Sequence, residues 1–418
     1  MISFLLNRGG LKIIKTCFLV SIIVMRWRSI YKTILKRCRV IGSEGVIEDG
    51  YIAIEEGTIV DLGRGRPTEY LGAVIDLEGY SVFPGFIDTH IHGIKGLDVT
   101  SHRDPEKILK MAMHLTEYGV TSFLPTTVTA PYEDLLEACR SVREAMSMWR
   151  STEGARILGI YFEGPYINPE AAGAQNKLYI RPPDLGEFRD LVESCGDVVR
   201  QITIAPELKG AENIIAFARE HGIVVSAGHS NASYEEGLRA VGLGVSKATH
   251  IFNGMRRFHH RDPGIALAML QSPNVYVEMI ADFIHLHRAV VKMVIDYISP
   301  DRAILVTDSI AATGMKDGIY ELGGLKVIVE KGICRLADKG ELAGSTLTMN
   351  RAVGNIIALG YSLSTAAKMS SLIPAKSINL EKHRIGDIRR RNKADLAVLD
   401  ENYRVIKTIV DGEIVYEI

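Results

Sequence analysis

Short apolar runs alternate with segments of helical periodicity along most of the chain, from residue 82 to residue 383. One helical segment has both ends marked, with Asp104 as N-cap, Pro105 at the first position and Gly119 as its stop. This alternation is typical of βα units that build a parallel sheet. The apolar runs predicted to be strands are Val82–Ile91, Ser122–Thr126, Ile157–Glu163, Gln201–Ala205, Ile223–Ala227, Lys247–Ile251, Val275–Ile280 and Ala303–Thr307. Repeats of this number predict an α/β fold, the (β/α)8 or TIM barrel, which needs about 250 residues or more.

Both ends of the chain carry a different pattern, in which strand-like runs follow one another closely and glycine turns separate them. These runs are Ile34–Ile41, Tyr51–Ile54, Thr58–Leu62, Ala394–Asp400, Val405–Val410 and Glu413–Tyr416. The tight spacing is typical of antiparallel hairpins. We therefore predict that residues 29–81 and 384–418 form a small β-sandwich domain outside a barrel at residues 82–383. A further pair of apolar runs predicts a β-hairpin insertion near residues 322–343.

Residues 1–28 precede the first predicted strand and form an N-terminal extension. Its apolar run, Cys17–Met25, is too short to span a bilayer. Lys12 and Lys15 before the run would suit a signal peptide, yet no small-residue cleavage site follows it. We interpret this region as reflecting a true translation start at Met25 or as an incidental extension, and a signal peptide is the alternative.

Composition and charge narrow the class of protein. Of 418 residues, 47% are hydrophobic, which is enough for a large core. The 49 basic and 50 acidic residues leave a net charge of −1, so no strong field draws the protein to nucleic acid or to a membrane. The five cysteines are scattered and include no CxxC pair, which argues against a disulfide framework and a cysteine zinc site. We expect a cytoplasmic protein that binds neither nucleic acid nor membranes.

Side chains that can bind a metal stand where several of the predicted barrel strands end. His90 and His92 end the first strand, Glu163 ends the third, His229 follows the fifth and His250 ends the sixth. Because the carboxyl ends of all barrel strands meet at one rim, we expect these side chains to converge. Imidazoles and a carboxylate around an open position are typical of a catalytic divalent site, and zinc or ferrous iron would suit them.

Each of these residues also has a structural interpretation when it is taken alone. His90 and His92 are two apart and share one face of a strand, but two histidines hydrogen-bonded in a core would look the same. Glu163 could pair with a basic group inside the barrel. Asp308 ends the eighth strand, where it could be a general acid/base near a metal-bound water or the N-cap of the next helix. Their joint occurrence at strand ends favours the metal site.

Seven segments of the chain, taken in order, resemble the N-acetylglucosamine-6-phosphate deacetylases of the amidohydrolase superfamily. They are PGFIDTHIHG (84–93), YFEGPYINP (161–169), SAGHSNA (226–232), THIFNGM (249–255), ADFIH (281–285), LVTDSIAATG (305–314) and LAGSTLTM (342–349). The resemblance runs from about residue 34 to the C-terminus. The HxH motif alone would indicate only the superfamily, whereas EGPY and SAGHS are specific to the family.

The resemblance implies roles for the matching residues. The implied metal ligands are Glu163, His229 and His250, with His90 and His92 able to hold a second ion. Asp308 would be the general acid/base. The implied substrate contacts are Ala174, Gln175, Asn253, Gly254, Arg261, His285, Leu342, Ala343 and Gly344. In this family the arginine tends to come from a neighbouring subunit, so we expect Arg261 to act across a homodimer.

The implied reaction removes the acetyl group from N-acetylglucosamine 6-phosphate. Gln175 stands where several members of the family carry a histidine that polarises the acetyl carbonyl. Glutamine can donate a hydrogen bond but cannot become an imidazolium, so we expect the metal to carry more of that task. One alternative is an amidohydrolase acting on a cyclic amide or a nucleobase. Many of those enzymes carry a modified lysine at the end of the fourth strand, and Gln201–Pro206 has none. The other alternative, an inactive scaffold, usually lacks metal ligands that are all present here.

Overall fold

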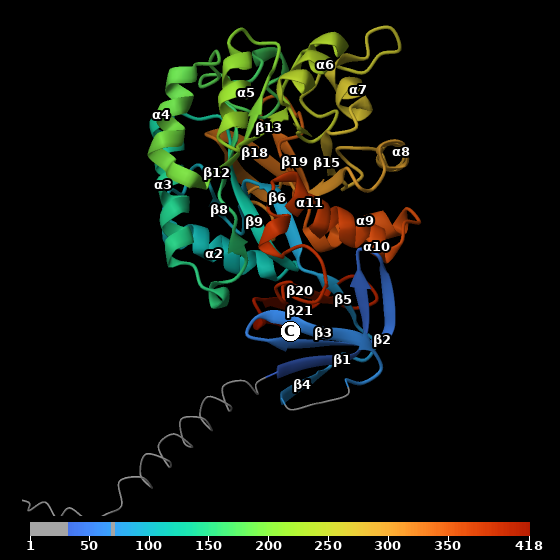
Figure 1. Cartoon of the computed structure of the whole chain (residues 1–418). Helices are drawn as coiled ribbons and strands as arrows, with labels where there is room; N and C mark the ends of the chain where they lie inside the picture. The colour runs from blue at the N-terminus through green and yellow to red at the C-terminus, as the bar shows by residue number, and fades with distance from the viewer. Residues whose placement is uncertain (1–31, 68–71) are drawn as a thin grey trace, which may run out of the picture.

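The computed structural model describes residues 32–67 and 72–418 as an α/β barrel beside a second, strand-rich unit (Figure 1). The extension at residues 1–28 lies outside the described residues. In Figure 1 the blue strands from the start of the described chain and the red strands from its end lie together below the barrel. Both ends of the chain therefore build one β-unit, as the sequence predicts.

Eight parallel strands form a nearly closed barrel, the predicted (β/α)8 architecture. In sheet order they are β6 (Phe86–Ile91), β9 (Val120–Thr127), the interrupted strand β10 (Arg156–Ile157) and β11 (Ile160–Glu163), β12 (Val199–Ile204), β13 (Val224–Ala227), β14 (Lys247–Ala248), β15 (Tyr276–Ile280) and β16 (Ala303–Val306). The ring closes where Ile91 bridges to Ser309. There the backbone N–H of His92 donates to the carbonyl of Ser309 at 2.9 Å. The two strand ends that carry the HxH motif and Asp308 are thereby neighbours.

The first predicted strand, Val82–Ile91, is two strands in the structure. β5 (Ser81–Pro84) pairs with β20 and β1 in the lower sheet, and only β6 belongs to the barrel. The chain changes sheets at Gly85, where a Cβ would overlap the side chain of Thr121. The prediction of one continuous strand was wrong, because an apolar run does not show where the chain changes partners.

Helices follow the barrel strands and cover the outside of the barrel (Figure 1). They are α2 (Pro105–Thr116), α3 (Tyr132–Met148), α4 (Leu185–Cys195), α5 (Ala211–Glu220), α6 (Tyr234–Leu243), α7 (Gly264–Gln271), α8 (Arg288–Ile298), α9 (Met349–Ala358), α10 (Leu363–Ala367) and α11 (Ile373–Ser377). The carboxylate of Asp104 accepts a hydrogen bond from the N–H of Glu106 at 2.9 Å, which confirms the predicted N-cap of α2. None of the helices in the described ranges is long and apolar enough to cross a membrane.

The lower sheet contains strands from both ends of the chain. Its order is β22 (Glu413–Glu417), β21 (Val405–Val410), β20 (Leu396–Leu399), β5, β1 (Lys32–Gly42), β2 (Gly45–Glu55) and β3 (Thr58–Arg64), and β4 (Gly72–Asp76) pairs with β1. Leu35, Ile52, Val82 and Leu396 are fully buried in its own apolar core. A separate antiparallel sheet of β17 (Gly318–Leu322), β18 (Leu325–Glu330) and β19 (Ile333–Leu336) follows the eighth barrel strand.

Two cysteines pair in the structure, although their scattered positions argued against a disulfide framework. Cys139 on α3 and Cys195 at the end of α4 form a disulfide, with Cα atoms 5.8 Å apart. The two residues are 56 positions apart, and only the packing of neighbouring helices brings them together. Cys38 and Cys334 are buried and free.

Candidate metal centre and its cavity

Six ionisable side chains converge at the carboxyl rim of the barrel. They are His90, His92, Glu163, His229, His250 and Asp308. His90 and Glu163 lie on β6 and β11, and the others stand just beyond the ends of β6, β13, β14 and β16. All six are buried, with Asp308 the most exposed at 7%. The fold thus brings together the ligand candidates that the sequence spreads over more than two hundred positions.

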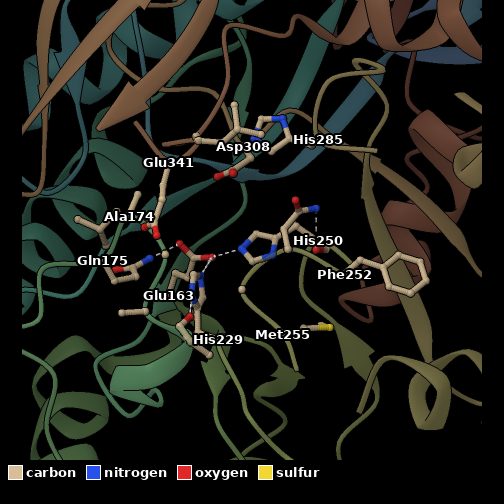
Figure 2. A pocket seen from close by; sticks show the side chains of 18 of the residues that line it. Glu163, Ala174, Gln175, His229, His250, Phe252, Met255, His285, Asp308 and Glu341 are labelled. Carbon is tan, nitrogen blue, oxygen red and sulfur yellow. Dashed lines mark hydrogen bonds and ion pairs between the residues drawn. The ribbon is translucent and has the colours of Figure 1, made fainter. Parts of the chain in front are cut away.

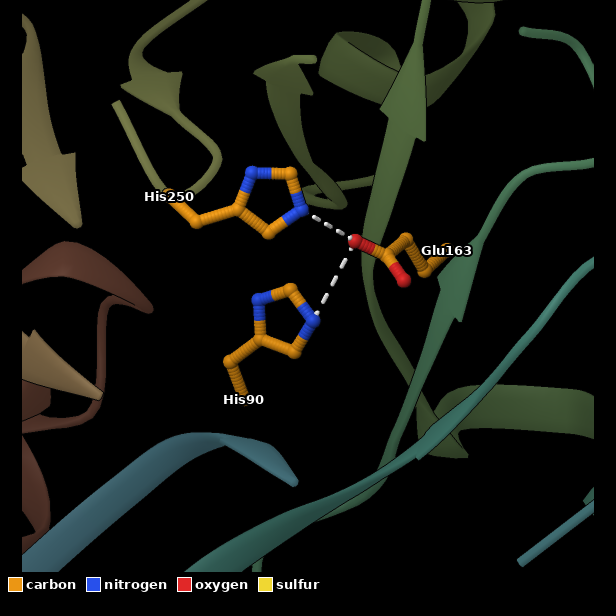
Figure 3. A group of neighbouring side chains, drawn as sticks. All are labelled: His90, Glu163 and His250. Atoms are coloured by element: carbon orange, nitrogen blue, oxygen red, sulfur yellow. Dashed lines mark hydrogen bonds and ion pairs between the residues drawn. The ribbon is translucent and has the colours of Figure 1, made fainter. Parts of the chain in front are cut away.

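Glu163 lies at the centre of this group. Its Oε1 atom is 2.9 Å from Nε2 of His250, 3.2 Å from Nε2 of His229 and 3.3 Å from Nε2 of His90. Figure 3 shows the rings of His90 and His250 aimed at the same carboxylate oxygen. One oxygen with two lone pairs is a crowded acceptor for three imidazole nitrogens.

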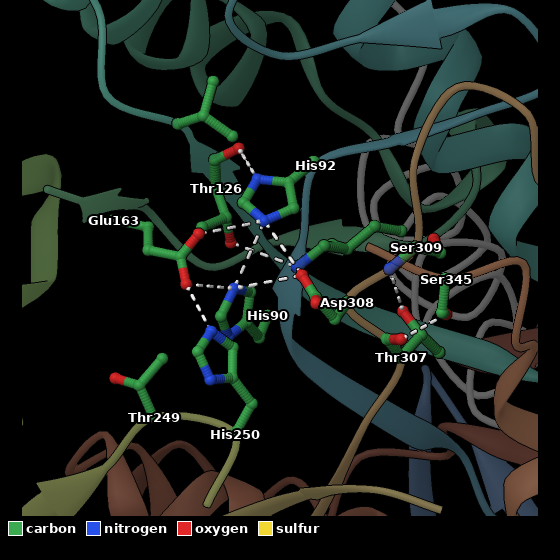
Figure 4. Close-up of polar contacts among 12 residues, drawn as sticks. His90, His92, Thr126, Glu163, Thr249, His250, Thr307, Asp308, Ser309 and Ser345 are labelled. Atoms are coloured by element: carbon green, nitrogen blue, oxygen red, sulfur yellow. Dashed lines mark hydrogen bonds and ion pairs between the residues drawn. The ribbon is translucent and has the colours of Figure 1, made fainter. Parts of the chain in front are cut away.

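His92 and Asp308 extend the group on one side (Figure 4). Nε2 of His92 is 3.0 Å from Oδ1 of Asp308 and 3.3 Å from Oε2 of Glu163. It is also 3.3 Å from Nε2 of His90. The ligand atoms form two sets of suitable spacing, His90, Glu163 and His250 in one and His90, His92 and Asp308 in the other. His90 belongs to both sets.

Hydrogen bonds behind three of the imidazoles fix which nitrogen faces the group. Nδ1 of His92 lies 3.1 Å from the carbonyl oxygen of Thr126, and Nδ1 of His229 lies 3.0 Å from that of Ala171. A carbonyl oxygen only accepts, so each Nδ1 donates its proton there, and Nε2 is the nitrogen that offers a lone pair to a cation once it has lost its own proton. Nδ1 of His90 faces a buried carboxylate in the same way.

This donor set fits a divalent cation. Imidazole nitrogens and carboxylate oxygens that face one another at these distances repel unless a positive charge, a proton or a metal cation, lies between them. Burial lowers the pKa of His92, but its hydrogen bonds with Asp308 and Glu163 outweigh burial and raise the pKa to about 9. Burial also raises the pKa of Glu163, yet the nearby His90 and His229 hold it well below the usual range. Protons therefore supply the charge in the free chain, and imidazoles with a carboxylate are a typical zinc ligand set.

Three residues of the group have backbone conformations that L-residues rarely adopt. The φ angles are 46° at His229, 26° at His250 and 50° at Asp308. Left-handed backbone at a non-glycine residue costs about 1–3 kcal/mol and clusters at functional sites. Each of these residues is the second residue after the end of a barrel strand, so the fold carries strain where it aims the side chains into the site.

A cavity of about 540 Å³ opens onto this group (Figure 2). Its lining includes the predicted substrate contacts Ala174, Gln175, Asn253, Gly254, His285, Leu342 and Gly344. Gly254 has a φ of 57°, and a Cβ there would lie 2.8 Å from Nδ1 of His229. Only glycine lets the backbone approach that ring so closely. The volume suits a small organic ligand.

Two of the predicted substrate contacts do not line the cavity. Ala343 is fully buried in an apolar cluster with Ile310 and Val327, so its side chain faces away from any ligand. Arg261 is exposed, and its Nη1 lies 2.9 Å from Nε2 of His260. Within one chain Arg261 does not reach the cavity, and its action across a homodimer stays a prediction.

Basic side chains at the cavity mouth were not predicted. They are Lys177, Arg256, Arg257 and Lys339. Arg256 pairs with Asp262 at 2.6 Å, whereas the other three make no ion pair within the described part of the chain. Exposed basic residues are common on protein surfaces, so the sequence alone offered no reason to single them out.

Two buried charged residues inside the barrel were also missed. Glu278 on β15 and Lys247 on β14 are both fully buried, and their charged atoms lie 2.8 Å apart. The sequence did indicate Glu278, because a lone charge inside an apolar strand is costly unless it has a partner. Glu278 stands in the middle of the apolar run Val275–Ile280.

Gln175 contacts Glu163 in the structure. Its Nε2 donates to Oε2 of Glu163 at 2.6 Å, and its Oε1 accepts from the N–H of Thr129 at 2.6 Å. Because a backbone N–H only donates and a carboxylate only accepts, the orientation of the amide is fixed. Gln175 therefore holds the central carboxylate, and it keeps one further N–H for a ligand.

We expect Gln175→Ala to lower the turnover number roughly tenfold or more, because it removes the bond to Glu163 and a donor at the cavity. Initial rates of acetate release measure this change. Asn176→Ala is the matched control, since that amide donates to the carbonyl of Gly323 at 3.2 Å, away from Glu163. A loss below about twofold in the Gln175 variant would exclude this residue from the reaction.

The comparison with known proteins defines the class. The profile of the amidohydrolase family matches residues 81–415, and the chain belongs to this family of metal-dependent enzymes. Within the family it is similar to N-acetylglucosamine-6-phosphate deacetylases. It is 34% identical to that of Bacillus subtilis over 390 residues, which covers 92% of this chain and 97% of the relative.

Two further relatives extend this comparison. The N-acetylgalactosamine-6-phosphate deacetylase of Escherichia coli O157:H7 is 33% identical, over 91% of this chain and 98% of the relative. The structure of an N-acetyl-D-glucosamine-6-phosphate deacetylase variant from Mycobacterium smegmatis, in complex with N-acetyl-D-glucosamine-6-phosphate, has a TM-score of 0.86 and 31% identity. That alignment covers 92% of this chain and 99% of the other.

Proposed function

We propose that the protein hydrolyses the acetamide of N-acetylglucosamine 6-phosphate to acetate and glucosamine 6-phosphate. The observation that carries the proposal is the buried group of histidines with Glu163 and Asp308 at the base of a ligand-sized cavity. Similarity to deacetylases over nearly the whole described chain supplies the substrate class. All the predicted ligands, His229 included, lie in the rim group, which weighs against an inactive scaffold.

We further propose that Glu163, His229 and His250 hold a zinc or ferrous ion, with His90 and His92 available to a second. When bound, the cation supplies Lewis acidity that lowers the pKa of a water molecule and polarises the substrate carbonyl. The chain aims the Nε2 atoms of His90, His92 and His229 before binding by hydrogen bonds at their Nδ1 atoms. Because these three rings are already oriented, they need little reorganisation on binding, whereas Nδ1 of His250 has no hydrogen-bond partner among the described residues.

Asp308 is the proposed general acid/base. Burial raises the pKa of Asp308, but the hydrogen bond with His92 and the charges of His90 and His92 outweigh it and lower the pKa. The carboxylate is therefore ionised at neutral pH and can take a proton from the attacking water. The same carboxyl then gives that proton to the amine nitrogen as the C–N bond breaks.

The cavity walls are proposed to bind the sugar phosphate. Asn253, the backbone of Gly254 and His285 lie where they can donate to phosphate or hydroxyl oxygens. Nδ1 of His285 is 2.7 Å from Oδ2 of Asp282, which fixes the ring. Ala174, Leu342 and Gly344 form the remaining wall. The basic groups at the mouth favour a dianionic ligand.

Acetate release tests the function directly. The substrates are N-acetylglucosamine 6-phosphate, N-acetylgalactosamine 6-phosphate and unphosphorylated N-acetylglucosamine. We expect kcat/KM to be about a hundredfold higher with a phosphate, since two charge-assisted hydrogen bonds contribute about 3 kcal/mol or more together. Faster deacetylation of N-acetylgalactosamine 6-phosphate would assign to the protein the activity of the Escherichia coli relative. A protein that released no acetate from either of the two phosphorylated sugars would refute the proposal.

The homodimer and the cytoplasmic location stay predictions. Sedimentation of the purified chain tests the first of them.

A further inference from the structure

A buried charge pair lies inside the barrel, next to the metal centre. Nζ of Lys247 is 2.8 Å from Oε1 of Glu278, 3.0 Å from Oε1 of Gln201 and 3.1 Å from Oγ1 of Thr89. An ammonium group has three N–H donors, and here all three have an acceptor. Both charged side chains are fully buried, so each depends on the other for its charge to be tolerated.

Glu278 connects this pair to the candidate metal ligands. Its Oε2 atom lies 3.0 Å from Nδ1 of His90 and 3.4 Å from the backbone N of His250. Its Oε1 atom also accepts from Nε2 of Gln201 at 3.3 Å. One carboxylate therefore contacts the ring of one ligand candidate and the backbone of another.

The chemistry of this contact decides how His90 is presented. A carboxylate only accepts, so Nδ1 of His90 carries a proton, and Nε2, which faces Glu163, is the nitrogen left to bind a cation. A carboxylate behind a metal-binding imidazole also makes the ring a stronger ligand. Stability alone does not explain this buried salt bridge, since a protein with well-packed apolar residues of the same size in its place is often equally stable.

We propose that Glu278 is a positioning residue that orients His90 for metal binding, and that Lys247 is the counter-charge that lets this carboxylate be buried beside the site. The inference rests on the proposed function only in requiring that His90 take part in a metal centre. It makes no use of the identity of the substrate.

The test separates positioning from stability with three variants, Glu278→Gln, Lys247→Met and the double variant. Each single change leaves one buried charge without its partner, whereas the double change leaves none. Zinc affinity of the metal-free protein is measured by chelator competition, and thermal unfolding of the same samples reports stability. Glu278→Gln is expected to weaken binding of the second zinc equivalent, the one assigned to His90 and His92, about 10–100-fold. The double variant should recover melting temperature relative to the single variants, while its affinity for that second equivalent stays about 10–100-fold below that of the unchanged protein.

The exposed pair Lys292–Asp296 on α8, with atoms 2.8 Å apart, provides the matched control. Lys292→Met with Asp296→Asn removes the same charges from the surface and should leave zinc affinity unchanged. A Glu278/Lys247 double variant that binds the second zinc equivalent within about twofold of the unchanged protein would overturn the proposal, and so would unchanged protein that binds no second equivalent. Zinc binding without acetate release would refute the proposed function and leave this inference intact.

Discussion

Asp308→Asn should lower the turnover number by roughly 10²–10⁴-fold while the protein keeps its metal. Asparagine has nearly the same shape as aspartate but cannot take a proton from water or return one to the amine. The backbone N–H of Asp308, which donates to the carbonyl of His90 at 2.9 Å, is unaffected by the change. The measurements are kcat by acetate release and metal content by plasma emission on the same preparation.

The control for this experiment is Asp190→Asn, an exposed carboxylate on α4. It removes one charge far from the rim and should change neither quantity. Near-normal turnover in the Asp308 variant would remove this residue from the proton-transfer step. Loss of metal together with activity would show that Asp308 acts chiefly as a ligand.

Glu163→Gln should abolish tight metal binding, with an affinity loss of about a hundredfold or more. The change leaves the volume almost constant but removes the charge that three imidazole nitrogens share. Loss of a residue that only supports a metal ligand typically lowers metal affinity about 10–100-fold, and loss of the central carboxylate should lower it at least as much. Metal content after dialysis, with zinc added back in a titration, measures the effect.

Stability gives a second measurement on this variant. In metal-free protein the change leaves buried imidazoles without their counter-charge, so unfolding should become easier by about 3–5 kcal/mol. Glu187→Gln is the control, since that half-buried carboxylate pairs with Arg181 at 2.8 Å, outside the rim group. A Glu163 variant that retained one equivalent of metal through dialysis would show that the other ligands suffice without it.

The barrel and its rim could be predicted because two features of the sequence agree, the alternation of strands with helices and the position of polar residues at the strand ends. Apolar strands alternate with helices, and polar residues such as Glu163 and Asp308 stand where the strands end. Once the strands are parallel and closed into a ring, convergence at one rim follows from geometry. The parallel direction of the strands and the closure of the sheet are therefore enough to predict that these side chains lie close together.

What could not be predicted depends on packing between distant elements. The division of the first strand at Gly85 and the pairing of Cys139 with Cys195 both require knowing which elements become neighbours. The buried position of Ala343 likewise follows from the apolar cluster around the β17–β19 sheet. The proposed role of Glu278 depends on Lys247 on the preceding barrel strand, and no local pattern shows that partner.

Anomalous scattering from zinc-soaked crystals would locate the metal directly. Data collected at the zinc edge should show a peak about 2.0–2.2 Å from a carboxylate oxygen of Glu163 and from Nε2 of His229 and His250. Asp308 should face the open side of that peak. A strong peak elsewhere, with these side chains left without an ion, would contradict the account.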